Sequence, residues 1–368
     1  MGNEKRAKTT FEVLNGLRGI AAIAVVNAHL QTYFGSAYAH NVGLAVDFFF
    51  LLSGFVIAHA YDERMRVSGS LKTFLISRIL RLYPVYIVAT LLGAAACWIL
   101  WNWTGPLHFS VTLFAALFML PPPPFLSANS YNLMPLDFAA WSLFFELVAN
   151  VVYGVLGRLL TTKMLVSIVA LSLLGLVACG MSWGTLDLGA EPRYFLGGMA
   201  RVMFSFFLGV ALHRVWLKWP IGINLHPALL FAALIAPLIL MPAKGLVWQY
   251  DLAVIVIYFP TLLMLAAQSR SGRLWTVISA ALGALSYPLY VLHVPIWESI
   301  KPSFDRMLIH AMPCGGIAFI GLLLPLSWAV ETLVDVPFRE AVKRRIFRRP
   351  RPDQSGMSLD AQKSALKG

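Results

Sequence analysis

Long apolar segments recur along this chain from Leu14 to Val334, and a typical one runs for roughly 17 to 25 residues. A helix of that length crosses the hydrocarbon core of a bilayer, because each helical residue adds ~1.5 Å. Hydrophobic residues make up 59% of the chain and charged residues 12%, and the mean hydropathy is +0.73. Soluble globular proteins rarely have such a composition. The sequence therefore predicts an all-α, polytopic integral membrane protein.

Ten of these segments are predicted to span the membrane. They lie at 14–33, 42–60, 82–101, 138–157, 164–183, 196–213, 227–241, 250–267, 275–293 and 313–334. Another apolar run, 109–120, is shorter and is followed by Pro121, so we expect a re-entrant or interfacial helix there. No polar stretch is long enough for a second soluble domain. We expect one membrane domain over 1–340, followed by a basic, disordered cytoplasmic tail over 341–368.

The basic residues are distributed as this topology requires. With ten crossings and the N-terminus inside, all but five of the 29 Lys and Arg residues fall on the cytoplasmic side, in agreement with the positive-inside rule. The five exceptions are Arg193, Arg201, Lys244, Lys301 and Arg306. A full crossing at 109–120 would reverse every later loop. The net charge of +12 therefore indicates inner loops that face anionic lipid rather than a nucleic-acid partner.

The N-terminal segment also has features of a signal peptide. Three basic residues precede the first apolar run, and Ala37-Tyr38-Ala39 is typical of a cleavage site. However, Asn27 and His29 interrupt the apolar run, and cleavage would remove the most distinctive residues of the chain. We expect an uncleaved first span.

Arg18 and His29 are the most distinctive residues of the first span. Eleven positions separate them, which is ~16 Å of rise and close to three helical turns, so both lie on one face of the helix. Ionisable residues inside a membrane are costly and usually serve a function. The alternative is an Arg that reaches the interface and a His whose polar atoms a neighbouring helix satisfies.

Two further spans carry isolated charges. Asp47 enters an almost unbroken apolar run and needs a partner, for which His29 and Arg18 are the candidates; otherwise it is a hydrated residue at the interface. Arg78 and Arg81 lie three residues apart on one helical face and suit a phosphorylated ligand. A lipid headgroup would suit the same pair.

Two aromatic segments add possible site residues. Trp141 begins a segment that places Glu146 one turn inside the fourth span. Tyr287 and His293 lie near the outer end of the ninth span, in a segment that also contains Pro288 and Pro295. They either frame a binding site or belong to an interfacial aromatic belt.

Taken together, these residues resemble the bacterial membrane acyltransferase-3 family. The likeness covers residues 11–340 in the family's order. It is carried by Arg18 with His29, Asp47-Phe-Phe-Phe, Ser53-Gly54-Phe55, Arg78-x-x-Arg81-x-x-Pro84, Trp141-Ser142-Leu143 with Glu146, and Ser286-Tyr287-Pro288 with His293. The chain departs from the family where Leu147 follows Glu146 in place of a second acid, and where Asp335-Val-Pro337 replaces Glu-x-Pro. Glu331 could share the role of Asp335.

The resemblance implies an enzyme in the bacterial inner membrane, with ten crossings and both termini in the cytoplasm. Members take an acyl group from cytoplasmic acyl-CoA, most simply acetyl-CoA, and deliver it to a carbohydrate hydroxyl. Acceptors include exopolysaccharide, lipopolysaccharide O-antigen, peptidoglycan and lipochitooligosaccharide, so the expected partners are acyl-CoA, a carbohydrate or lipid-linked glycan, and membrane lipid. No metal is expected, and the three cysteines are widely separated.

The expected roles follow from this likeness. His29 would be the general base or would carry the acyl group, and Asp47 or Glu146 would orient its ring. Arg18 would position the pantetheine arm or a phosphate. The donor side would also include Arg78, Arg81 and Ser53, and the acceptor side Trp141, Tyr287 and His293. The alternative function is a non-enzymatic transporter or flippase of lipid-linked sugar, which would use the same intramembrane charges.

Overall fold

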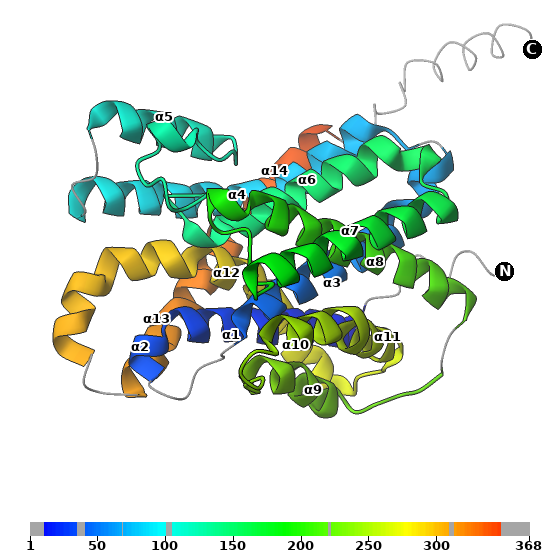
Figure 1. The fold of residues 1–368 in the computed structure, drawn as a ribbon. Coiled ribbons are helices and arrows are strands. Elements are labelled where there is room, and N and C mark those ends of the chain that lie inside the picture. The colour runs from blue at the N-terminus through cyan, green and yellow to red at the C-terminus, as the bar shows by residue number, and fades with distance from the viewer. Residues whose placement is uncertain are drawn as a thin grey trace, which may run out of the picture.

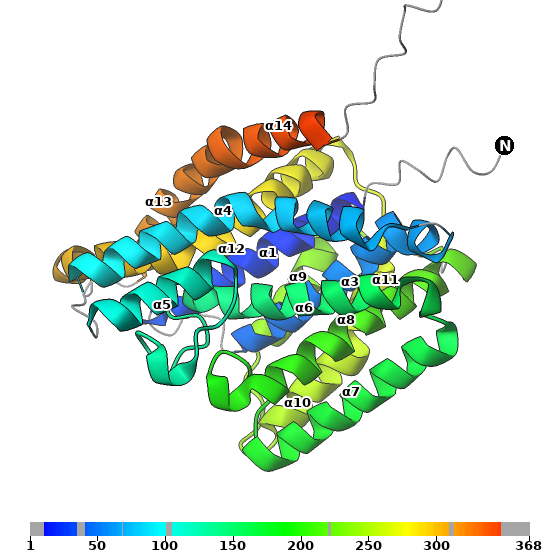
Figure 2. The same cartoon turned by 90° about the horizontal axis from the view of Figure 1, so that it is seen from above.

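The fold is a bundle of helices. The computed structural model describes residues 11–34, 41–67, 69–100, 105–219, 222–308 and 313–346, and these residues contain no β-strand. The long helices pack side by side, with α5 (Pro106–Leu117) at the end of the bundle away from the last turn of α14 (Val336–Ile346), as Figures 1 and 2 show. The all-α prediction is confirmed.

The remaining helices follow in chain order. The first half contains α1 (Glu12–His29), α2 (Gln31–Phe34), α3 (Val42–Val67), α4 (Leu71–Leu100), η2 (Pro124–Leu126), η3 (Phe138–Ala140), α6 (Trp141–Leu156), η4 (Gly157–Leu159) and α7 (Thr162–Trp183). The second half contains η5 (Pro192–Tyr194), α8 (Phe195–Lys218), α9 (Pro227–Ile239), α10 (Val247–Ala253), the π-helical η6 (Val254–Tyr258), α11 (Phe259–Gln268), α12 (Arg273–Leu308), α13 (Cys314–Val330) and the π-helical η7 (Glu331–Asp335).

Eight helical segments in the described part of the chain are long and apolar enough to cross a membrane. They coincide with eight of the ten predicted spans, which confirms a polytopic membrane protein. The other two predicted spans are α1, which carries Arg18 and other polar residues, and α9, which has 13 residues. The predicted re-entrant segment is α5, a helix of 12 residues.

The two ends of the bundle differ in charge. Where α3 ends, Asp62 forms an ion pair with Arg214 of α8, and Arg214 also donates to the carbonyl of Leu160. Arg64 lies near the end of α3 and Arg158 lies in η4, and we call this end of the bundle the basic end. The opposite end holds α5 and the segment 118–137.

Helices α1 and α12 are the central pair, and they run in the same direction. At the basic end, Ser271 and Thr276 donate hydrogen bonds to Glu12 and lower the pKa of its carboxyl. Further along, a Cβ on Gly19 would lie 2.5 Å from Cβ of Leu282, so only glycine permits this approach. The pair thus holds residues of α1 and α12 in fixed register.

Helix α12 extends beyond its predicted end. The ninth span is predicted to end at residue 293, but the helix continues through Pro295 and Pro302 to Leu308. Proline is tolerated in helices of membrane proteins because neighbouring groups can satisfy the freed carbonyls. The predicted domain boundary at 340 falls inside α14, and residues 347–368 of the predicted tail lie outside the described residues.

Candidate active site

His29, the last residue of α1, faces a second histidine on α12. Nδ1 of His29 lies 3.0 Å from Nε2 of His293 and 3.0 Å from the carbonyl oxygen of Val25. His293 is fully buried, and its Nδ1 lies 2.7 Å from the carbonyl oxygen of Tyr290. The register of α1 against α12 therefore joins the two imidazoles, and His293, expected on the acceptor side, contacts the predicted base directly.

The hydrogen bonds assign the protons of the neutral pair. The carbonyl of Tyr290 can only accept, so Nδ1 of His293 carries a proton and its Nε2 bears the lone pair. Nδ1–H of His29 then donates to that lone pair and to Val25. Nε2 of His29 is left with its own lone pair and has no hydrogen-bond partner among the described residues. A histidine held in this tautomer can accept a proton or act as a nucleophile.

A cavity rich in arginine lies toward the basic end from this pair. It has a volume of about 150 Å³, and its walls include Arg18, Arg78, Arg81, Ser53 and Glu146. We call it the arginine cavity. Three guanidinium groups and one carboxylate among these lining residues leave a formal charge of +2. The structure thus brings together all four residues predicted for the donor side and gives them the charge that a phosphorylated ligand requires.

The arginines of this cavity are only partly paired. Arg18 donates to the hydroxyl of Ser286 and the carbonyl of Gly283, both at 2.8 Å, and both partners are neutral. Arg78 lies 3.6 Å from Glu146, and its buried Nε has no partner among the described residues. Arg81 has neither an ion pair nor a hydrogen bond in the described part of the chain. Positive charge is therefore available to an anion.

Glu146 belongs to this cavity rather than to the histidine pair. It accepts a hydrogen bond from Ser53 at 2.6 Å and faces Arg78. The prediction that it orients the ring of His29 is wrong, because His293 does so. Glu331 and Asp335, which the sequence analysis also noted, both pair with Arg339.

Two hydroxyls close the arginine cavity toward the histidines. Ser142 and Tyr290 both line it, and their hydroxyl oxygens are 2.7 Å apart. The backbone of Tyr290 accepts the hydrogen bond from His293. Tyr290 therefore connects the cavity wall to the histidine pair.

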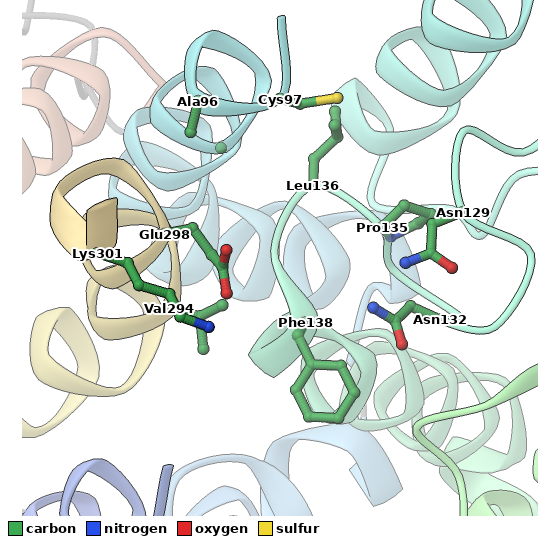
Figure 3. Close-up of a pocket in the computed structure, with 11 residues that line it drawn as sticks. Ala96, Cys97, Asn129, Asn132, Pro135, Leu136, Phe138, Val294, Glu298 and Lys301 are labelled. Atoms are coloured by element: carbon green, nitrogen blue, oxygen red, sulfur yellow. The ribbon is translucent and has the colours of Figure 1, made fainter. Parts of the chain in front are cut away.

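A second cavity, of about 280 Å³, lies on the other side of the pair. Among the residues that line it are Asn129, Asn132, Phe138, Glu298 and Lys301 (Figure 3). We call it the amide cavity. The ring of Phe138 also packs edge-on against His29, with ring centroids 5.8 Å apart. The histidine pair thus lies between the two cavities and contacts a wall residue of each.

Asp47 is not a partner of the histidine. It faces α8, where Nε and Nη2 of Arg201 donate to its two oxygens at 3.1 and 2.9 Å. A Cβ on Gly54 would lie 1.9 Å from the carbonyl oxygen of Phe206, so α3 and α8 approach closely and place the two residues together. The predicted pairing with His29 or Arg18 is wrong.

Tyr287 and Trp141, the other two residues expected on the acceptor side, do not line the amide cavity. Tyr287 lines the arginine cavity and donates to the carbonyl of Leu82. Trp141 is buried, and the guanidinium of Arg201 lies 5.3 Å from its ring. Tyr287 therefore belongs to the wall of the arginine cavity, and Trp141 packs against Arg201.

Sequence reasoning missed the polar lining of the amide cavity. Glu298 and Lys301 follow His293 on the same helix, but the predicted span ends at residue 293, which assigns these two residues to a loop. Asn129 and Asn132 lie in a proline-rich loop with no periodic pattern. The available signal was that four polar side chains lie just outside the predicted spans, two before the fourth span and two after the ninth.

The helical bundle thus holds a histidine pair in contact with Phe138 of one cavity wall and Tyr290 of the other. The chain belongs to the acyltransferase-3 family, whose profile, described as an acyltransferase domain, matches residues 11–332. It is therefore a membrane acyltransferase.

A curated relative is also similar to part of the chain. "Protein 2 in picA locus" of Rhizobium radiobacter is 38% identical over 176 residues, which is 44% of this chain and 90% of that protein. No solved structure matches the chain.

Proposed function

We propose that this protein is an O-acyltransferase that moves an acyl group, most simply acetyl, from acyl-CoA in the arginine cavity to a hydroxyl of a cell-envelope carbohydrate. The observation that carries the proposal is the position of the histidine pair between a cavity with a formal charge of +2 and a second polar cavity. The phosphates of CoA match the first cavity, because guanidinium groups bind phosphate oxygens in a bidentate manner.

His29 provides the chemistry at its Nε2 atom. In direct transfer, Nε2 accepts the hydroxyl proton while the hydroxyl oxygen attacks the carbonyl carbon of the thioester. A C–O bond forms, the C–S bond breaks, and the proton passes to the sulfur of CoA. In a two-step route Nε2 attacks the thioester carbon first, so that a C–N bond forms, the C–S bond breaks and CoA thiolate leaves. The acceptor hydroxyl then attacks the acyl carbon, the C–N bond breaks, and the hydroxyl proton passes to the thiolate. In both routes His293 stabilises the tautomer that keeps Nε2 open.

The basic end faces the cytoplasm in this proposal. The positive-inside rule supports that orientation, since Arg64 and Arg158 lie there. Acyl-CoA would enter from the cytoplasm, and the carbohydrate would enter from the opposite face of the bacterial inner membrane. Both termini would be cytoplasmic.

Release of free CoA by the purified protein tests the function. The protein in detergent is supplied with acetyl-CoA and a glycan extract of the cell envelope, and free thiol is followed with a colorimetric reagent. Thiol should appear only when both substrates are present, and labelled acetyl should appear on the glycan. If the protein moves lipid-linked sugar across the membrane of vesicles and releases no thiol, the alternative function as a transporter or flippase is supported instead.

A further inference from the structure

The amide cavity has no net charge among its described lining residues. Glu298 and Lys301 contribute one negative and one positive group, and Asn129 and Asn132 contribute two neutral amides. Figure 3 shows the ends of Glu298 and Lys301 on the α12 side of the space and the two amides on the other side. The arginine cavity, by contrast, has three positive groups and one negative group.

The polar ends of these side chains are available to a ligand. Glu298 and Lys301 form no ion pair with each other or with another described residue, although they lie three positions apart on one helix. The ammonium of Lys301 lies 6.0 Å from the ring centroid of Trp297, which leaves its N–H donors for a ligand. Asn132 has no hydrogen bond in the described part of the chain. The side-chain oxygen of Asn129 accepts from the amide of Tyr131, and its NH₂ group has no partner among the described residues. Donors and acceptors thus face one space from two sides.

The walls of the amide cavity are fixed by packing. A Cβ on Gly93 would lie 1.7 Å from the carbonyl oxygen of Leu136, so α4 and the loop approach as closely as only glycine allows. The amide of Leu133 donates to the carbonyl of Ala190 at 2.8 Å. The segment 118–137 therefore holds Asn129 and Asn132 in a defined position.

The size and position of the cavity restrict its occupant. About 280 Å³ lies at the lower limit for small-molecule sites, ~300 Å³, which suits one sugar ring rather than a longer chain. Phe138 forms part of the wall and contacts His29, and Val294 in the wall follows His293 directly. A ring in this cavity would lie beside the histidine pair.

We infer that the amide cavity is the acceptor site and that it takes a single, uncharged, hydroxyl-rich sugar residue. Asn129, Asn132, Glu298 and Lys301 bind the hydroxyls that do not react, and the reacting hydroxyl passes Phe138 to reach Nε2 of His29. The inference rests on the proposed acyltransferase function and names the chemistry of its acceptor.

A panel of methyl glycosides tests the charge of the acceptor. Purified protein in detergent, saturated with acetyl-CoA, receives the neutral methyl glucoside, galactoside, mannoside or N-acetylglucosaminide, or the anionic methyl glucuronide. At least one neutral glycoside should accelerate CoA release in a saturable manner. The glucuronide should need a concentration about tenfold higher to reach the same rate. Stimulation by the glucuronide alone would overturn the inference, as would stimulation by none of the five while acetyl-CoA still binds.

Side-chain replacements test the location of the acceptor. Asn132→Ala and Glu298→Ala should each raise the KM of the neutral glycoside about tenfold, since each removes a hydrogen-bonding group, and should leave the KM of acetyl-CoA unchanged. Ser299→Ala is the matched control, because Ser299 is the neighbour of Glu298 but donates to the carbonyl of Pro295 in its own helix. Equal KM values for the wild type and both variants would place the acceptor elsewhere.

The charge pair gives a prediction of sign. Glu298→Gln leaves the positive charge of Lys301 unopposed and should lower the KM of the glucuronide relative to that of the neutral glycoside. Lys301→Gln should raise the KM of the glucuronide further. The opposite order would overturn the inference. Failure of the proposed function has a different signature, namely no binding of acetyl-CoA and no CoA release with any acceptor.

Discussion

Arg201 and Arg78 both pair with a carboxylate inside the bundle, yet their surroundings differ. All five N–H groups of Arg201 are used, by Asp47 twice, by Asp187, and by the carbonyls of Gly43 and Leu188. Arg201 and Asp47 are only 1% and 2% exposed. Arg78 and Glu146 are each 16% exposed, their atoms lie 3.6 Å apart, and Nε of Arg78 is unpaired among the described residues.

This difference indicates which charges hold the fold and which meet a ligand. A saturated, buried guanidinium has nothing left to offer a substrate, whereas a partly paired one beside a cavity does. His29 is an intermediate case, because His293 and Val25 use one of its nitrogens and the other is open. The degree of saturation therefore predicts the kind of damage that each replacement causes.

Loss of the open nitrogen should have the largest effect. His29→Ala should lower the rate of acyl transfer by about 10³- to 10⁴-fold, because it removes the general base, while binding of acetyl-CoA persists. CoA release and donor binding are measured separately. His59→Ala is the control, since His59 also contacts a histidine, His213 at 3.3 Å, but lies near the basic end.

A second pair of measurements separates chemistry from packing at His29. Activity should fall as the pH drops through the imidazole range, because protonated Nε2 cannot accept a proton. His29→Gln keeps polarity and approximate size. If the Gln variant is folded and transfers acyl groups at nearly the wild-type rate, His29 is structural.

Loss of the saturated arginine should damage stability instead. Arg201→Ala leaves Asp47 buried without a counter-charge and should lower the free energy of unfolding by ~3–5 kcal/mol. The melting temperature in detergent reports this change. Arg193→Ala breaks an exposed pair with Glu191 and should leave the melting temperature unchanged. Equal melting temperatures for both variants would show that Arg201 does not stabilise the bundle.

The unsaturated arginines should give the reverse result. Arg78→Ala combined with Arg81→Ala should weaken acetyl-CoA binding at least about 100-fold, because two charge-assisted contacts disappear, with little change in melting temperature. Lysine at either position should restore binding only in part, since the planar fork is lost. Arg158→Ala, an exposed arginine of the basic end, serves as control. Unchanged donor affinity in the double variant would make the pair a lipid anchor.

The smallest effect is expected at the carboxylate of the arginine cavity. Glu146→Gln keeps an acceptor for Ser53 but removes the negative charge, so acetyl-CoA should bind equally well or up to about fivefold more tightly. Equilibrium binding measures the change, and Glu191→Gln is the control. Tenfold weaker binding would mean that Glu146 positions Arg78 rather than merely opposing its charge.

Apolar periodicity predicts the eight spans that the described part of the chain contains, and the family resemblance added the residues that line the arginine cavity. Apolar length predicts a helix wherever lipid must be crossed, and the spacing of Arg18 and His29 places both on the face that α12 covers. The sequence could not pair Asp47 with Arg201, because 154 positions separate them and only the close approach of α3 and α8 brings them together. The amide cavity was likewise hidden, since it depends on a loop without periodicity and on a helix that continues through its prolines.

The glycine-tight contact between α1 and α12 also sets a length. Arg18 is tied to Ser286 at one level and His29 to His293 at another, ~16 Å further along α1. A donor whose phosphate rests at the lower level must carry its acyl group at the end of a long, flexible tether to reach the open nitrogen. Acetyl phosphate has no tether, because its acyl carbon is bonded directly to a phosphate oxygen. It should therefore compete with acetyl-CoA for the guanidinium groups and yet transfer nothing.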